Sequence, residues 1–258
     1  MIRREFEYFF AALRFFTRIP APIWVGHSAE QLNHAARWFP AVGIIVGAMG
    51  AAVTLMAASL WPPSIAVLLG MAATLLVTGA FHEDGLTDTL DGLGGGFTRE
   101  QALTIMKDSR IGSFGAIGIV VVLLIKFAAL SELLASAGTV PSAPTFALAL
   151  IGGHAVSRFA ATTLIYALDY AREAGKAKPL ATRLAINELA FAALIGLAPC
   201  LWLPWQQAAV ALLFVTLVTL LAARWFRQRL GGYTGDCLGA TQQLTEIAFY
   251  LGLTCACG

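Results

Sequence analysis

Residues 64–92 read SIAVLLGMAATLLVTGAFHEDGLTDTLDG, and this stretch decides the class of fold. Its first part, 64–82, is apolar and long enough to cross the hydrocarbon core of a bilayer, which takes about 20 helical residues. Its second part, 83–91, carries four carboxylates with no Lys or Arg among them. The stretch therefore predicts a transmembrane helix that ends in a cluster of acids.

The composition extends the membrane prediction to the whole chain. The 258 residues are 58% hydrophobic and only 12% charged, and the mean hydropathy is +0.75. A soluble domain carries about 25% charged residues, so this chain lacks the charge needed to cover a water-facing surface. The formal net charge of +2 provides no basic field for a polyanion and argues against nucleic acid as a partner.

Seven apolar stretches are candidate spans, and the period of their apolar residues favours helices over a barrel. They are 38–60, 64–82, 111–135, 145–168, 184–203, 206–224 and 236–256. The proline-containing segments 61–63 and 203–205 predict tight hairpins. The amphipathic segment 5–18 is too short to span and predicts a helix in the membrane interface. We therefore expect an all-α polytopic membrane bundle of about seven helices plus an N-terminal interfacial helix, in one domain over 1–258.

The basic residues indicate the orientation of this bundle. Fifteen of the seventeen Lys and Arg residues precede the first span, lie in the loops after the second, fourth and sixth spans, or, as Arg224 does, end the sixth span at the same side. Only Lys126 and Arg158 lie within spans away from their ends. Because cytoplasmic loops carry an excess of Lys and Arg, this side is expected to be cytoplasmic, with the N-terminus inside.

The acids after the second span predict a metal site. Asp84, Asp88 and Asp91 point within about 60° of one another if the helix continues. Three carboxylates on one face repel each other unless a cation lies between them, and hard oxygen ligands favour Mg²⁺ or Mn²⁺. A solvated acidic loop is the alternative, but the intervening residues are Gly, Leu and Thr rather than Lys or Ser.

Two features follow the acids. The glycine-rich run 92–96 predicts a turn, which serves either as a hinge or as backbone that approaches a phosphate. A capping box at 98–101 then predicts a short helix to about residue 107. At its end, Lys107 and Arg110 flank Asp108, where the two cations either anchor the topology or clamp a phosphate.

Ionisable residues also lie within two later spans. His154 and Arg158 are one helical turn apart in the fourth span, and a buried arginine in a membrane needs a carboxylate or an anionic ligand. Asp236 and Glu246 lie broadly along one face of the last span. Interhelical hydrogen bonding explains why glutamines occur on that face, but it does not explain well why an ionised Glu246 would occur there. Two arrangements remain open: Arg158 pairs with Glu246, or it meets a substrate phosphate.

Carboxylates that bind a divalent ion, together with Lys and Arg, are suited to displacement at phosphorus. Four segments, moreover, resemble the signature blocks of the cobalamin synthases, or adenosylcobinamide-GDP ribazoletransferases. These segments are 13–20 (LRFFTRIP), 82–92 (HEDGLTDTLDG), 105–112 (IMKDSRIG) and 231–240 (GGYTGDCLGA). They stand in the family's order and spread over nearly the whole chain.

The resemblance implies a multi-pass enzyme of the cell inner membrane that performs the last joining step of cobalamin assembly with Mg²⁺. Its substrates would be adenosylcobinamide-GDP and α-ribazole, or α-ribazole 5′-phosphate, and GMP would leave. Membrane lipid is the other expected partner, and a homo-oligomer is left open. From charge type and position we assign metal binding and catalysis to Asp84, Asp88 and Asp91, proton acceptance to Asp108 or a free acid of that cluster, and substrate binding to Lys107, Arg110, His154, Arg158, Asp236 and Glu246.

Two other functions are alternatives to this one. A CDP-alcohol phosphotransferase of phospholipid synthesis would follow its Asp-Gly with Ala-Arg, whereas Leu86, Thr87 and Asp88 follow Asp84-Gly85 here. A membrane transporter would place its acids near the middle of the membrane and show a repeat between its halves. We find no convincing repeat.

Overall fold

The computed structural model describes residues 2–26, 28–136, 143–172 and 184–255, and this part of the chain is helical without a β-strand. The all-α prediction is therefore confirmed. The helices are α1 (Ile2–Phe16), α2 (Ala29–Ala35), the 3-10 turn η1 (Ala36–Trp38), α3 (Phe39–Ala58), α4 (Pro63–Thr78), α5 (Phe81–Gly95), α6 (Arg99–Ile105), α7 (Ser113–Ser136), α8 (Ala143–Ala167), α9 (Ile186–Leu197), the 3-10 turn η3 (Ala198–Trp202), α10 (Trp205–Leu230) and α11 (Gly235–Thr254).

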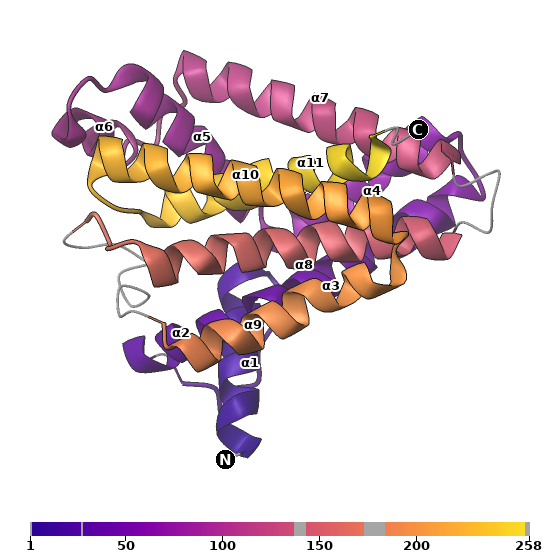
Figure 1. Cartoon of the computed structure of the whole chain (residues 1–258), viewed down its shortest axis with the longest axis horizontal. Helices are drawn as coiled ribbons and strands as arrows, with labels where there is room; N and C mark the ends of the chain where they lie inside the picture. Colours follow the sequence, from indigo (N-terminus) through magenta and orange to yellow (C-terminus); the bar gives the residue numbers. More distant parts are fainter. Residues whose placement is uncertain (1, 27, 137–142, 173–183, 256–258) are drawn as a thin grey trace.

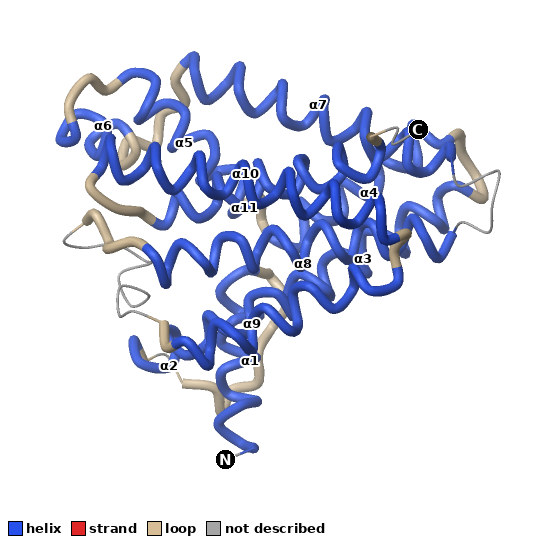
Figure 2. The backbone as a smooth tube through the Cα atoms, viewed as in Figure 1, coloured by secondary structure: helices blue, strands red, loops and turns tan. Residues whose placement is uncertain are grey.

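Helix α11 lies at the centre of the bundle, where α5, α7, α8 and α10 surround it. In Figure 1, α7, α10 and α8 run roughly alongside one another, and α1 projects away with the N-terminus. Figure 2 shows how short most of the loops between the described helices are. Most of α11 is buried, including Gln242, Gln243 and Glu246. Because these neighbours shield α11 from lipid, it can carry polar residues that would be unfavourable on a lipid-facing helix.

Small residues allow two of the central helices to pack closely. A Cβ atom built on Gly47 of α3 would lie 2.7 Å from the carbonyl oxygen of Leu150 on α8, and one on Gly43 would overlap the backbone of His154. A glycine every fourth residue is the usual means by which membrane helices approach each other. This contact fixes α8, which carries Arg158, against the bundle.

The second predicted span does not continue as one helix into the acids. Helix α4 ends at Thr78, and Gly79 (φ 67°) and Ala80 (φ 55°) both adopt the left-handed conformation. The chain then bends by 87° before α5 begins. Glycine adopts this conformation freely, whereas Ala80 does so at a cost of about 1 kcal/mol or more. The expected continuous helix is wrong, and the acids lie on a helix of their own.

The glycine-rich run at 92–96 is not the predicted turn. Helix α5 continues through Gly95 and ends at Gly96, whose backbone is extended (φ −89°, ψ 124°) while its N–H still donates to the carbonyl of Gly92 at 3.0 Å. A Cβ atom on Gly94 would lie 2.6 Å from the ring of Phe114, and one on Gly96 would lie 2.5 Å from the backbone nitrogen of Ala102. These glycines therefore serve close packing of α5 against α6 and the start of α7.

The other local predictions from the sequence agree more closely with the structure. Residues 5–16 of the segment 5–18 are helical as part of α1, and the capping box joins Thr98 and Gln101 at the start of α6. Helices lie at all seven predicted positions. In the described residues, four helical segments are long and apolar enough to cross a membrane, or five if α4 and α5 form one bent span. The number of crossings therefore stays a prediction.

Several loops with basic residues meet at one end of the bundle, on the left in Figure 1. Arg99 donates to the carbonyl oxygens of Leu230 (2.7 Å) and Ala171 (2.9 Å), and Arg229 donates to that of Gly96 (2.5 Å). These bonds tie the start of α6 to the ends of α8 and α10. This is the arrangement expected if these loops share one side of the membrane.

Candidate functional site

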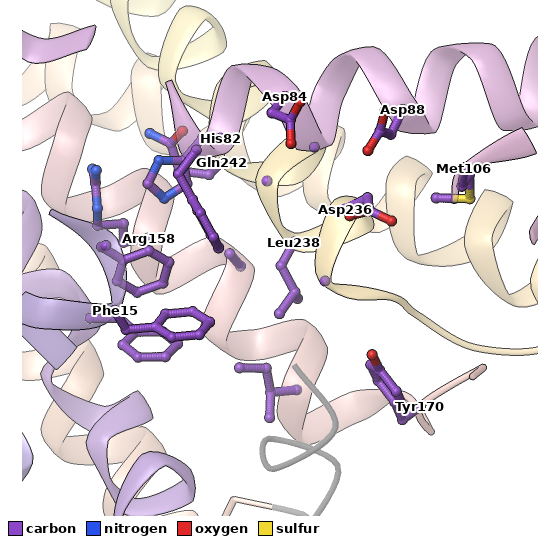
Figure 3. Close-up of a pocket in the computed structure, with 18 of the residues that line it drawn as sticks. Phe15, His82, Asp84, Asp88, Met106, Arg158, Tyr170, Asp236, Leu238 and Gln242 are labelled. Atoms are coloured by element: carbon purple, nitrogen blue, oxygen red, sulfur yellow. The ribbon is translucent and has the colours of Figure 1, made fainter. Parts of the chain in front are cut away.

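A cavity of about 350 Å³ opens between α1, α3, α5, α8 and α11. Figure 3 shows that carboxylates line one part of the cavity, whereas a guanidinium, an imidazole and an amide line another. Asp84, Asp88 and Asp236 lie in one part, and Arg158, His82 and Gln242 lie in another. Asp84 is exposed whereas Arg158 is only 2% exposed, so the acids stand nearer to solvent and the arginine lies deeper.

The acidic part of the cavity is built from two helices. Asp84 and Asp88 are one turn apart on α5, and Asp236 lies opposite them in the first turn of α11 (Figure 3). The helices come close because of glycines at their contact: a Cβ atom on Gly85 would lie 3.0 Å from the carbonyl oxygen of Asp236. Arg172, just after α8, forms an ion pair with Asp236 at 2.8 Å.

Asp91 is placed differently from the other acids of α5. Its carboxylate accepts the backbone N–H of Gly112 at 2.7 Å and that of Gly115 at 2.8 Å. A carboxylate at the N-terminus of a helix stabilises it, here α7, through the free N–H groups and the helix dipole. The structure therefore brings Asp84 and Asp88 together with Asp236 rather than with Asp91. Within the described ranges, no preformed group of three or more His, Cys, Asp or Glu side chains could hold a metal ion.

Arg158 faces the cavity as a buried cation. Its Nη1 donates to the carbonyl oxygen of His154 at 3.0 Å and lies 3.2 Å from the Nδ1 atom of the same residue. Its Nε has no hydrogen-bond partner, and Arg158 makes no ion pair with any residue in the described part of the chain. A buried guanidinium in this situation is suited to an anionic ligand.

Glu246 lies behind the cavity rather than in its wall, and its partner is Lys126. The Lys126 Nζ atom is 2.6 Å from the Glu246 carboxylate, and both side chains are almost fully buried. The direct pair between Arg158 and Glu246, one of the two arrangements left open by the sequence, is therefore not formed. His154 also lies outside the cavity wall, with its Nδ1 3.4 Å from Glu246.

The predicted phosphate clamp after α6 is only partly brought to the site. Lys107 lines the cavity. Asp108 and Arg110 do not, and they form an ion pair with each other at 2.5 Å on the surface. Hydrogen bonds from Arg110 lower the pKa of the Asp108 carboxyl, which makes it a weaker proton acceptor.

Sequence reasoning missed several residues of the cavity. Phe15 and Phe16 of α1 form an aromatic wall with Phe39 and Phe81. The Phe16 ring stacks on His82, with centroids 5.1 Å apart. The sequence signal for this wall is the pair Phe15 and Phe16, which belongs both to the amphipathic segment 5–18 and to the family-like block 13–20. In the sequence pattern, Arg172 is one of several basic loop residues, and Gln242 is a glutamine suited to interhelical hydrogen bonding.

The family model described as Cobalamin-5-phosphate synthase matches residues 8–254. A relative from Leptothrix cholodnii, named adenosylcobinamide-GDP ribazoletransferase, is 49% identical over 257 residues, which cover 96% of this chain and 95% of the relative. Relatives of the same name from Shewanella frigidimarina and Ralstonia nicotianae are 45% and 48% identical; they cover 96% and 92% of this chain and are themselves covered to 94% and 90%. No solved structure matches the chain. The match across nearly all of the sequence shows that the chain belongs to the cobalamin-5-phosphate synthase family.

Proposed function

We propose that this protein is an adenosylcobinamide-GDP ribazoletransferase. It joins adenosylcobinamide-GDP to α-ribazole, or to α-ribazole 5′-phosphate, and yields adenosylcobalamin, or its 5′-phosphate, and GMP. The observation that carries the proposal is a cavity with three carboxylates in one part and a buried arginine without an ion-pair partner among the described residues in another. A diphosphate fits this arrangement, because both cations and carboxylate-bound metal favour phosphate oxygens.

In the proposed reaction, the 3′-hydroxyl oxygen of the ribazole attacks the phosphorus that is bonded to the cobinamide arm. The bond from this phosphorus to the bridging oxygen of the diphosphate breaks, and GMP leaves with that oxygen. Arg158 and Lys107 line the cavity and are assigned to binding phosphate oxygens, which orients the phosphorus for attack. An acid of the cavity wall that is not a metal ligand accepts the proton of the hydroxyl.

The residues present fit a Mg²⁺ ion. Asp84, Asp88 and Asp236 supply hard carboxylate oxygens around one space. Mg²⁺ is usually held by one or two carboxylates plus substrate phosphates, so a preformed cage of three protein ligands is not required. When bound, the ion would neutralise charge on the diphosphate and stabilise the leaving phosphate. In this proposal Asp91 positions α7 and is not a ligand.

The aromatic wall suits a flat substrate group. Phe15, Phe16 and Phe39 present ring faces and edges beside the polar part of the cavity. Aromatic rings pack well on heteroaromatic bases, and both proposed substrates carry one. We assign this wall to a base of the substrates.

We also propose that the enzyme lies in the inner membrane with its N-terminus in the cytoplasm. Two cavity residues, Lys107 and Arg172, belong to loops whose basic residues favour the cytoplasmic side. The substrates would then enter from the cytoplasm. A single domain over 1–258 is sufficient for this arrangement.

The test is an incubation of purified protein with adenosylcobinamide-GDP, α-ribazole and Mg²⁺. We expect GMP and adenosylcobalamin to form in equal amounts, and to form only when both substrates are present. A parallel incubation with CDP-diacylglycerol and an alcohol tests the rival phosphotransferase activity. GMP release that does not require α-ribazole, or turnover in the parallel incubation alone, would overturn the proposal.

A further inference from the structure

Glu246 is the centre of a buried polar cluster behind the cavity. Its carboxylate is contacted by Lys126 (2.6 Å), by Gln242 Nε2 (2.6 Å) and by the Tyr250 hydroxyl (3.0 Å). Lys126 is the single lysine of α7 and is 3% exposed. None of the cluster's members except Gln242 lines the cavity. The ion pair is therefore outside the space in which the substrate is proposed to bind.

Arg158 lies within reach of this cluster without joining its ion pair. His154 Nδ1 is 3.2 Å from Nη1 of Arg158 and 3.4 Å from Glu246. A single histidine nitrogen therefore separates the guanidinium from the carboxylate. The other buried acid near them, Glu83, is held by Gln243 at 2.8 Å and has no ion pair with a described residue.

The charges of this region explain why Arg158 remains available. Two buried cations, Lys126 and Arg158, compete for the carboxylate of Glu246, and Lys126 occupies it. An ionised carboxylate buried without a cation is strongly unfavourable. If Lys126 were absent, the nearest permanently charged side chain able to compensate Glu246 would be Arg158, which lies just beyond His154 and would then turn away from the cavity.

We propose that Lys126 is a positioning residue that neutralises Glu246 and so keeps Arg158 free to bind the substrate phosphates. The nature of the phosphate compound rests on the proposed function, whereas the competition between the two cations rests on the buried cluster alone. Lys126 does not touch the substrate in this account. Its effect passes through the position of Arg158.

The test compares Lys126→Met with the double variant Lys126→Met/Glu246→Gln. The single variant should accumulate as folded protein but bind inorganic pyrophosphate, in the presence of Mg²⁺, about tenfold or more weakly, because Arg158 has turned to Glu246. The KM for adenosylcobinamide-GDP should rise by a similar factor. The double variant removes the competing carboxylate charge and should return both values to within about threefold of wild type.

Two further variants serve as controls. Lys126→Arg keeps the charge and should bind pyrophosphate better than Lys126→Met. Arg224→Met removes an exposed cation from α10, outside the cavity, and should leave both values unchanged. The thermal midpoint of each variant, measured without ligand, reports whether it is folded.

The outcomes separate this inference from the proposed function. Wild-type protein that binds pyrophosphate but does not release GMP would overturn the proposed function, and the binding series would still test Lys126. A folded Lys126→Met variant with wild-type affinity overturns the inference. A double variant that binds pyrophosphate as weakly as Lys126→Met also overturns the inference. A double variant that does not fold overturns it as well, since the proposal requires that uncharged side chains at positions 126 and 246 are tolerated.

Discussion

Replacing Asp91 by Asn should separate a structural role from a metal-binding role. The two carboxylate oxygens of Asp91 accept N–H groups of Gly112 and Gly115 at the start of α7. The amide of Asn has one oxygen acceptor, and its NH₂ group would face a second donor. The variant therefore loses one hydrogen bond to a charged group, which contributes about 1.5–3 kcal/mol.

A loss of about 2 kcal/mol should lower the thermal midpoint by roughly 4–8 °C for a chain of this size. The folded fraction should retain activity with an unchanged Mg²⁺ dependence, because Asp91 is not assigned to the metal. The assay is a thermal melt of detergent-purified protein together with a titration of GMP release against Mg²⁺. A normal midpoint with a large increase in the Mg²⁺ required would refute this reasoning and restore the sequence-based assignment of Asp91 as a ligand.

The remaining predictions concern the cavity and the membrane orientation. Asp84→Asn and Asp88→Asn should each remove most GMP release without lowering the thermal midpoint, and higher Mg²⁺ should partly rescue at least one; normal turnover of both at limiting Mg²⁺ would exclude them as ligands. Arg158→Met should remain folded but show a KM for adenosylcobinamide-GDP raised roughly tenfold to a hundredfold, and an unchanged KM would contradict the phosphate-binding role. In a cysteine-free background, a cysteine at Thr98 should be labelled only from the cytoplasm and one at Ser59 only from the opposite side; labelling of both from one side would show that the orientation of the spans is wrong.

Features that depend on neighbours in the chain were determined by the sequence itself. Hydropathy identified the candidate membrane helices, prolines marked the breaks before α4 and α10, and Thr98 with Gln101 identified the start of α6. The candidates Asp84, Asp88, Lys107, Arg158 and Asp236 all line the cavity. They were found because an ionisable residue in or beside an apolar span is costly, so its presence already indicates a function.

Features that depend on the direction of a helix after a bend were decided only by the tertiary structure. The left-handed pair Gly79 and Ala80 turns α5 by 87°, and residue periodicity along a straight helix cannot anticipate this. Asp91 belongs to the same helix face as Asp84 by spacing alone. Its carboxylate is nevertheless taken by the start of α7, which follows it along the chain and folds back against α5.

The sequence alone also could not predict which residues of distant segments pair with one another. Lys126 and Glu246 are separated by most of the second half of the chain, and nothing in either local pattern names the other as its partner. The same holds for Arg172 with Asp236, and for Phe16 of the first helix against His82. Each pair forms because helices far apart in the chain pack side by side, and only that packing determines which buried charge is neutralised and which, as for Arg158, still faces the cavity.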